Sequence, residues 1–166
     1  MTTKTQVIAT LEQQFYELMI SKKYHVSTAE SCTGGMLASR IINVPGASNI
    51  IEEAFITYSN QSKIKRLSIS EKMFEKHGAV SGECVKEMAE NLHKLTNCEL
   101  TIALSGIAGP TGGTPAKPVG TVWFGFYFKE QTIAIHKRFS GTRDLIRKLA
   151  TEFALQQAIE ILNNHK

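Results

Sequence analysis

The chain has 166 residues, of which 42% are hydrophobic and 20% charged, and its formal net charge is +4. A chain of this length is about one domain that buries a sizeable core, and the composition excludes a disordered protein. The densest basic cluster, Lys63, Lys65 and Arg66, has no aromatic neighbours on which bases could stack, so nucleic acid is a poorly supported partner. An anionic small molecule fits the same charge balance.

In the first half of the chain, helical and strand-like patterns alternate. Apolar residues recur at helical spacing over residues 4–22, and a short β-branched run at 24–29 predicts a buried strand. A polar turn at 30–35 leads into a predicted helix over 36–42, and 50–58 is strand-like although its acidic pair also permits a helix. This order is typical of a βαβ arrangement.

After this segment, three serines precede short helical patterns: Ser59 (followed by Asn60), Ser70 and Ser81. A serine hydroxyl at such a position caps the first free N–H groups of a helix. Three further elements are predicted. They are a strand at residues 100–104, a β-hairpin formed by residues 119–128 and 132–139, and a long final helix at residues 143–163.

The alternation of strands and helices predicts an α/β fold, a three-layer α/β/α domain with a mixed, mostly parallel sheet, because the hairpin adds antiparallel pairing. The sequence contains no linker, repeat or low-complexity segment, so we expect a single domain over residues 1–166.

Cysteine and histidine spacing gives no sign of a metal site. The three cysteines, Cys32, Cys84 and Cys98, are odd in number and form no CxxC pair, and the five histidines form no HExxH motif. The N-terminus lacks the apolar core of a signal peptide, and no apolar run approaches the roughly 20 residues of a membrane helix. We therefore expect a cytoplasmic protein with no metal, no cofactor and no membrane partner.

Two loops contain residues of the types that bind ligands or take part in catalysis. Residues 30–35 and 105–118 are rich in Gly, Ser and Thr, and each follows an apolar strand. In open α/β sheets, ligands bind beyond the carboxyl ends of the strands. Glycine lets the main chain approach a ligand, and free N–H groups at a helix start favour anions. Neither loop is a Walker A or a GxGxxG sequence, so a purely structural role stays open for both.

Ser31 is the first candidate nucleophile, because it lies between a predicted strand end and a helix start. There Thr33, Gly34 and Gly35 could offer N–H donors to an oxyanion. The alternative is that Ser31 or Thr33 merely caps the helix. Cys32 is a rival nucleophile, although no histidine lies in an evidently partnered loop that would make it a thiolate.

Lys63 is the candidate base, because it follows the next strand after a short polar turn. A lysine that is desolvated beside Ser31 could lose its proton near neutral pH and accept the seryl proton. The alternative is a solvated lysine on a helix surface.

Several segments follow one another in the order of a known family. They are residues 28–35 (TAESCTGG), 58–60 (YSN) with Lys63, 78–81 (GAVS), 106–113 (GIAGPTGG) and 117–122 (KPVGTV). On these motifs the chain resembles the CinA C-terminal domain family over about residues 8–163, in its stand-alone form. Longer members of that family carry a further N-terminal domain.

The resemblance implies a nicotinamide mononucleotide deamidase of pyridine nucleotide salvage, which releases nicotinate mononucleotide and ammonia without a metal. It implies that Ser31 is the nucleophile, Lys63 the base, and Tyr58 a hydroxyl that orients or relays the proton. It also implies a homo-oligomer. The substrate-binding residues that follow from it are Thr33, Gly34 and Gly35 at the oxyanion, and Ser105, Gly106, Gly109, Gly112, Gly113 and Arg143 at the phosphate and ribose.

The sequence departs from the family's pattern at two positions. Ser105 stands where the family usually has threonine, and Thr142 stands where an acidic residue usually precedes the arginine. Two other functions therefore stay open: a non-catalytic relative that binds a nucleotide, and an amidohydrolase of another small amide.

Overall fold

The computed structural model describes residues 9–164. Its elements are, in chain order, α1 (Leu11–Lys22), β1 (Val26–Glu30), α2 (Met36–Ile41), the 3₁₀ helix η1 (Ala47–Asn49), β2 (Ile51–Ile56), α3 (Asn60–Leu67), α4 (Glu71–His77), α5 (Gly82–Thr96), β3 (Leu100–Gly106), β4 (Thr121–Phe128), β5 (Gln131–Arg138) and α6 (Arg143–Asn164). Within these residues the predicted helices and strands are all present, and η1 was not predicted. The predicted first helix started at residue 4; residues 4–8 lie outside the described range, and α1 starts at Leu11.

The strands form one sheet in the order β2-β1-β3-β4-β5. β1 pairs in parallel with β2 and β3, whereas β4 pairs antiparallel with β3 and β5. The sheet is therefore mixed, and β4 alone of the described strands runs against the other four. This agrees with the predicted mixed and mostly parallel sheet.

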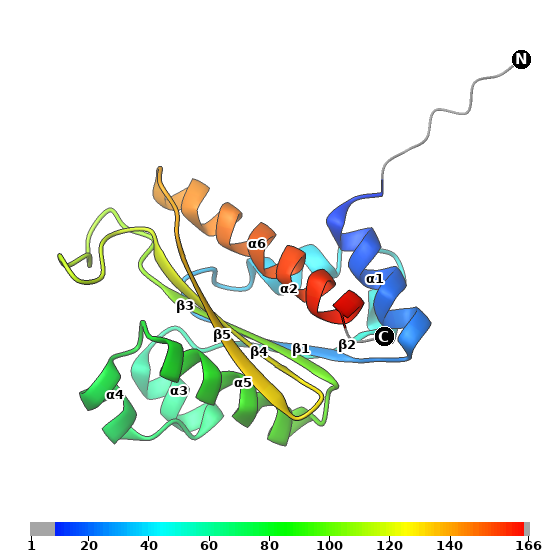
Figure 1. Cartoon of the computed structure of the whole chain (residues 1–166), viewed down its shortest axis with the longest axis horizontal. Coiled ribbons are helices and arrows are strands. Elements are labelled where there is room, and N and C mark those ends of the chain that lie inside the picture. The colour runs from blue at the N-terminus through cyan, green and yellow to red at the C-terminus, as the bar shows by residue number, and fades with distance from the viewer. Residues whose placement is uncertain (1–8, 165–166) are drawn as a thin grey trace, which may run out of the picture.

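Helices cover both faces of the sheet (Figure 1), which confirms the three-layer α/β/α prediction. On one face α1, α2 and α6 pack over a core that includes Phe15, Phe124 and Ile146. On the other face α3, α4 and α5 enclose a second core that includes Leu67 and Met88. Every residue of β1 is buried, because helices cover this strand from both sides.

The position of β1 creates the crevice in which a ligand can bind. Its neighbours β2 and β3 lie on opposite sides of it, so the connections after β1 and β3 open at the same edge of the sheet. Such a reversal of strand order is where open α/β sheets bind ligands, beyond the carboxyl ends of the strands. The segments that follow Glu30 and Gly106 both lie at this edge.

Local capping sets the starts of three helices, as predicted. The side-chain oxygens of Ser59, Ser70 and Ser81 each accept a hydrogen bond from the N–H three residues later. These hydroxyls satisfy donors that the first helical turn leaves without partners. The predicted hairpin turn is also present, with Lys129 and Glu130 at positive φ, which suits the twist of the paired strands.

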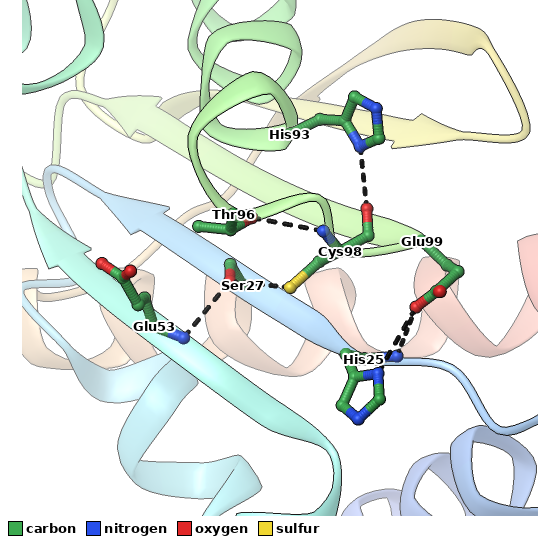
Figure 2. A network of polar contacts seen from close by, with 7 residues as sticks. All are labelled: His25, Ser27, Glu53, His93, Thr96, Cys98 and Glu99. Carbon is green, nitrogen blue, oxygen red and sulfur yellow. Dashed lines mark hydrogen bonds and ion pairs between the residues drawn. The ribbon is translucent and has the colours of Figure 1, made fainter.

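A separate polar network ties β1 to the start of β3 (Figure 2). The Ser27 hydroxyl lies 3.1 Å from Cys98 Sγ and accepts a hydrogen bond from Glu53 N, at a place where the β1–β2 register shifts. His93 Nδ1 lies 2.9 Å from the Cys98 carbonyl oxygen. The irregularity in the strand pairing leaves an N–H that the serine hydroxyl satisfies, so this network has a structural explanation.

Candidate active site

A buried serine and a buried lysine meet at the carboxyl end of β1. Ser31 follows β1 directly and is 8% exposed, and Lys63, on α3, is 1% exposed. Lys63 Nζ lies 3.0 Å from Ser31 Oγ, 2.7 Å from the Thr57 carbonyl oxygen and 3.3 Å from the Tyr58 carbonyl oxygen. Lys63 is therefore not the solvated helix lysine that was the alternative.

The surroundings of Lys63 favour its neutral form. Burial lowers the pKa of Lys63, and the nearby thiols of Cys84 and Cys32 oppose this with a smaller effect. A neutral amine beside a hydroxyl can accept its proton, so the pair has the composition and contact of a nucleophile with its base.

Glu30 organises the turn that carries Ser31. Its buried carboxylate accepts hydrogen bonds from the Thr33 hydroxyl at 2.6 Å and from the N–H groups of Gly35, Leu37 and Ala38 at 3.0, 3.1 and 2.9 Å. It thus occupies the N-terminus of α2, where a negative charge is stabilised.

Neither Ser31 nor Thr33 caps α2, so the capping interpretation is wrong. The N-cap residue is Gly35, which has no side chain to cap with. No role was predicted for Glu30. An acidic residue between a buried strand and a helix start was the available signal.

The turn uses two of the three N–H groups that were expected at an oxyanion. Gly34 N donates to the Ser31 carbonyl oxygen at 3.1 Å, and Gly35 N donates to Glu30. For Cys32 and Thr33, no described residue accepts a hydrogen bond from the main-chain N–H. The prediction therefore needs correction: within the described chain, the free donors next to Ser31 are those of Cys32 and Thr33.

Tyr58 contacts the pair through its main chain rather than through its hydroxyl. Its carbonyl oxygen accepts from Lys63 Nζ, whereas its hydroxyl accepts from Arg143 Nη2 at 2.9 Å. The side chain is 58% exposed. The expected hydroxyl relay thus has no direct contact with Ser31 or Lys63 in this structure.

The second glycine-rich loop adds polar groups beside the pair. Ser105 is 1% exposed, and its hydroxyl donates to the Ala79 carbonyl oxygen at 2.7 Å. Arg143, at the start of α6, donates from Nη1 to the Gly109 carbonyl oxygen at 2.9 Å. Arg143 thereby connects this loop to Tyr58.

These groups surround a pocket of about 190 Å³. Its lining includes Ser31, Lys63, Ser105, Gly106 and Arg143. The other predicted substrate-binding residues do not line it: Thr33, Gly34, Gly35, Gly109, Gly112 and Gly113.

Close packing within the loop accounts for two of its glycines. A Cβ on Gly109, whose φ is +77°, would lie 2.5 Å from Val119 Cγ1. A Cβ on Gly113 would lie 2.7 Å from the main-chain nitrogen of Val119. The loop folds back on Val119, and a larger residue at either position would disrupt that contact.

Arg147, on α6, also contacts the Ser31 turn, and sequence analysis missed it. Its Nε donates to the Cys32 carbonyl oxygen at 3.1 Å, and its Nη2 donates to the Thr33 carbonyl oxygen at 2.9 Å. The arginine is 115 residues from Cys32 in the sequence, so no local pattern could have revealed this contact.

Residues 9–164 show neither a metal-binding cluster nor a membrane-spanning helix. No group of three or more His, Cys, Asp or Glu side chains there is arranged to hold a metal ion. No helix within the same range combines the length and apolar character that crossing a membrane requires.

The fold and the buried pair together define a three-layer α/β protein with a serine and a lysine in hydrogen-bond contact at the switch point of the sheet. The family model of the CinA C-terminal domain matches residues 8–162. The chain therefore belongs to the CinA C-terminal domain family, as the sequence motifs indicated.

Relatives and solved structures agree with this assignment. The chain is 44% identical over 152 residues to a CinA-like protein of Petrotoga mobilis, covering 92% of the chain, and 43% identical over 156 residues to one of Thermotoga maritima, covering 94%. It spans 38% of the length of each of these relatives.

Among solved structures, a competence-damaged protein (CinA) superfamily protein of Klebsiella pneumoniae has a TM-score of 0.90 at 32% identity, covering 93% of this chain and 96% of that one. Its counterpart from Escherichia coli has a TM-score of 0.87 at 31% identity, covering 97% and 99%.

Proposed function

We propose that this protein hydrolyses the carboxamide of nicotinamide mononucleotide to nicotinate mononucleotide and ammonia, with Ser31 as nucleophile and Lys63 as base. The observation that carries the reaction type is the 3.0 Å contact between Lys63 Nζ and Ser31 Oγ, both buried. The choice of substrate rests on the resemblance to the CinA family.

The three contacts of Lys63 Nζ suit a base. A neutral amine has two N–H groups and one lone pair. The carbonyl oxygens of Thr57 and Tyr58 can only accept, so they can take the two N–H groups, which leaves the lone pair for the Ser31 hydroxyl. The Ser31 hydroxyl also lies 3.4 Å from the Tyr58 carbonyl oxygen, to which it can donate before the reaction. After proton transfer, the ammonium donates three hydrogen bonds to the same three oxygens. The site thus accommodates both protonation states without rearrangement.

In the proposed reaction, Ser31 Oγ attacks the amide carbon while its proton passes to Lys63 Nζ. The C–N bond then breaks, and the leaving nitrogen takes that proton and departs as ammonia. This leaves the nicotinoyl group of the mononucleotide as an ester on Ser31. Lys63 next takes a proton from water, the hydroxide attacks the ester carbon, and the proton returns to Ser31 Oγ as nicotinate mononucleotide leaves.

Arg143 is proposed to hold the phosphate of the substrate. A guanidinium has five N–H donors, and two of those of Arg143 bond Gly109 and Tyr58, which leaves three for phosphate oxygens. Its exposed position at the pocket rim allows a charged group to approach from solvent.

The test is ammonia release from nicotinamide mononucleotide by the purified protein, with nicotinate mononucleotide identified as the second product. Ser31→Ala is the matched control and should release none. A folded parent protein that binds the nucleotide but releases no ammonia would instead be a non-catalytic nucleotide-binding protein. A parent that releases ammonia from other amides but not from this one would be an amidohydrolase of different substrate.

A further inference from the structure

We propose that Arg147 is a positioning residue that fixes the turn after Ser31 through the carbonyl oxygens of Cys32 and Thr33, so that the main-chain N–H groups of this turn serve as donors for the oxyanion formed at Ser31. This inference rests on the proposed hydrolysis at Ser31. Arg147 contacts neither Ser31 Oγ nor Lys63 Nζ in the structure; it acts through the peptide groups that follow the nucleophile.

The turn after Ser31 is held from both ends by charged side chains. The Glu30 carboxylate takes the N–H groups of Gly35, Leu37 and Ala38, and the Arg147 guanidinium takes the carbonyl oxygens of Cys32 and Thr33.

These contacts, with the Gly34 N to Ser31 O hydrogen bond, leave the N–H groups of Cys32 and Thr33 without an acceptor among the described residues. Cys32 lines the pocket beside Ser31. A buried N–H without a partner costs about 1–3 kcal/mol, so a ligand oxygen that supplies the acceptor is favoured there.

Arg147 orients one of these donors, the Thr33 N–H, through the geometry of the peptide, whereas the Cys32 N–H belongs to the preceding peptide, whose carbonyl oxygen accepts from Gly34 N. The Cys32–Thr33 peptide is trans, so its C=O and N–H point in opposite directions. Arg147 holds the C=O from α6, which lies on one face of the sheet, whereas Lys63 approaches Ser31 from α3 on the other face (Figure 1). The N–H of Thr33 is therefore turned away from α6, toward the layer from which the base reaches Ser31.

The charge of Arg147 also favours an anion at this turn. Burial raises the pKa of the Cys32 thiol to about 11; a main-chain hydrogen bond lowers it, the negative charge of Glu30 raises it, and the positive charges of Lys63 and Arg147 lower it by smaller effects. A positive group that favours a thiolate at Cys32 also favours an oxyanion at the same peptide. Hydrogen bonding to a peptide carbonyl further polarises its N–H, which strengthens the donor.

The experiment uses two readouts, so that failure of the inference and failure of the proposed function can be told apart. The first is kcat and KM for ammonia release from nicotinamide mononucleotide. The second is boron NMR with pyridine-3-boronic acid. A bond forms between boron and Ser31 Oγ, the hydroxyl proton passes to Lys63, and the product is a four-coordinate boronate anion. The second readout requires the oxyanion donors but not hydrolysis of the nucleotide.

Arg147→Lys keeps the charge but cannot bridge two carbonyl oxygens as the planar guanidinium does. We expect kcat to fall by about 100-fold with KM nearly unchanged, since an oxyanion donor acts in the transition state. We expect the four-coordinate boron signal to be lost as well. Arg138→Lys, the same change at an exposed arginine of β5, should alter neither readout.

Chemical rescue of an Arg147 variant distinguishes a positioning role of the guanidinium group from a general loss of structure. In Arg147→Ala, added guanidinium chloride at millimolar concentration should restore part of kcat and of the boronate signal, and it should restore neither in Ser31→Ala. The inference is overturned if Arg147→Lys keeps the parent kcat and boronate signal, or if the parent forms no boronate. A parent that forms the boronate but releases no ammonia refutes only the proposed substrate, and Arg147→Lys then still tests the inference through boron NMR.

Discussion

Lys63 Nζ lies 3.0 Å from Ser31 Oγ, although 32 residues separate the two in the sequence. The contact joins the end of β1 to the first turns of α3, and both side chains are buried. Burial lowers the pKa of Lys63, so the lysine is prepared to accept a proton.

Lys63→Arg should reduce kcat for ammonia release by about 100-fold or more, because a guanidinium does not act as a base at accessible pH. In the parent, kcat/KM should rise with pH along a limb whose midpoint lies below the free lysine value of about 10.4, since only neutral Lys63 can accept the proton. Lys65→Arg, at an exposed position of the same helix, is the control. A Lys63→Arg variant with about a quarter of the parent rate would exclude lysine as the base.

Lys63 should also make stability depend on pH. Its pKa is lowered in the folded protein, so between that value and about 10.4 the unfolded chain binds more protons than the folded one. The free energy of unfolding of the parent should therefore rise, relative to Lys63→Met, as the pH rises through this window. Below the lowered pKa the full penalty of the buried charge applies. Urea unfolding of both proteins across this pH range measures the difference, and a pH-independent difference would contradict it.

Ser31→Ala should abolish ammonia release, whereas Cys32→Ala should keep most of it. Burial raises the pKa of the Cys32 thiol to about 11, so at neutral pH it is protonated and a poor nucleophile. Removing the Ser31 hydroxyl takes one partner from Lys63 Nζ and should cost about 1 kcal/mol of stability. Ammonia assays on both variants decide between the two residues; loss of activity in Cys32→Ala alone would reverse the assignment.

Arg143→Ala should raise KM for the mononucleotide more than it lowers kcat, since a phosphate contact acts in ground and transition states alike. Lys148→Ala, at an exposed position on the same helix, controls for the change in net charge. If Arg143→Ala matches the parent in both constants, the phosphate binds elsewhere, and the main chain of the 109–113 loop becomes the better candidate.

Glu30→Gln should destabilise the fold by about 2–3 kcal/mol, because it removes a charged acceptor that holds four donors. Glutamine keeps one acceptor oxygen, so at least one donor of the α2 N-terminus would face an NH₂ group. Glu52→Gln, at an exposed position of β2, should change stability little. Urea unfolding measures both variants, and equal stability would mean that Glu30 does not hold the turn.

Helix starts and the hairpin could be predicted because their causes are local. Ser59, Ser70 and Ser81 cap the helices that follow them, through hydrogen bonds that span three residues. The spacing of apolar residues likewise identified the buried strands and α6, because this spacing differs between helices and strands and can be recognised within a short segment. The motifs around Ser31 and Lys63 indicated the family, and the matching family model and structures agree.

Sequence alone determined the element order, the fold class and the candidate pair. Only the tertiary structure decided how the turn after Ser31 is held, because the residue types do not show which side chain reaches which main-chain group. Glu30 rather than Ser31 or Thr33 satisfies the start of α2, and Tyr58 reaches Lys63 through its carbonyl group. Arg147 reaches the turn from 115 residues away. Hydrogen bonds of this kind depend on how the helices pack on the sheet. The residue types alone do not show which main-chain carbonyl group will lie within hydrogen-bond distance of a given side chain.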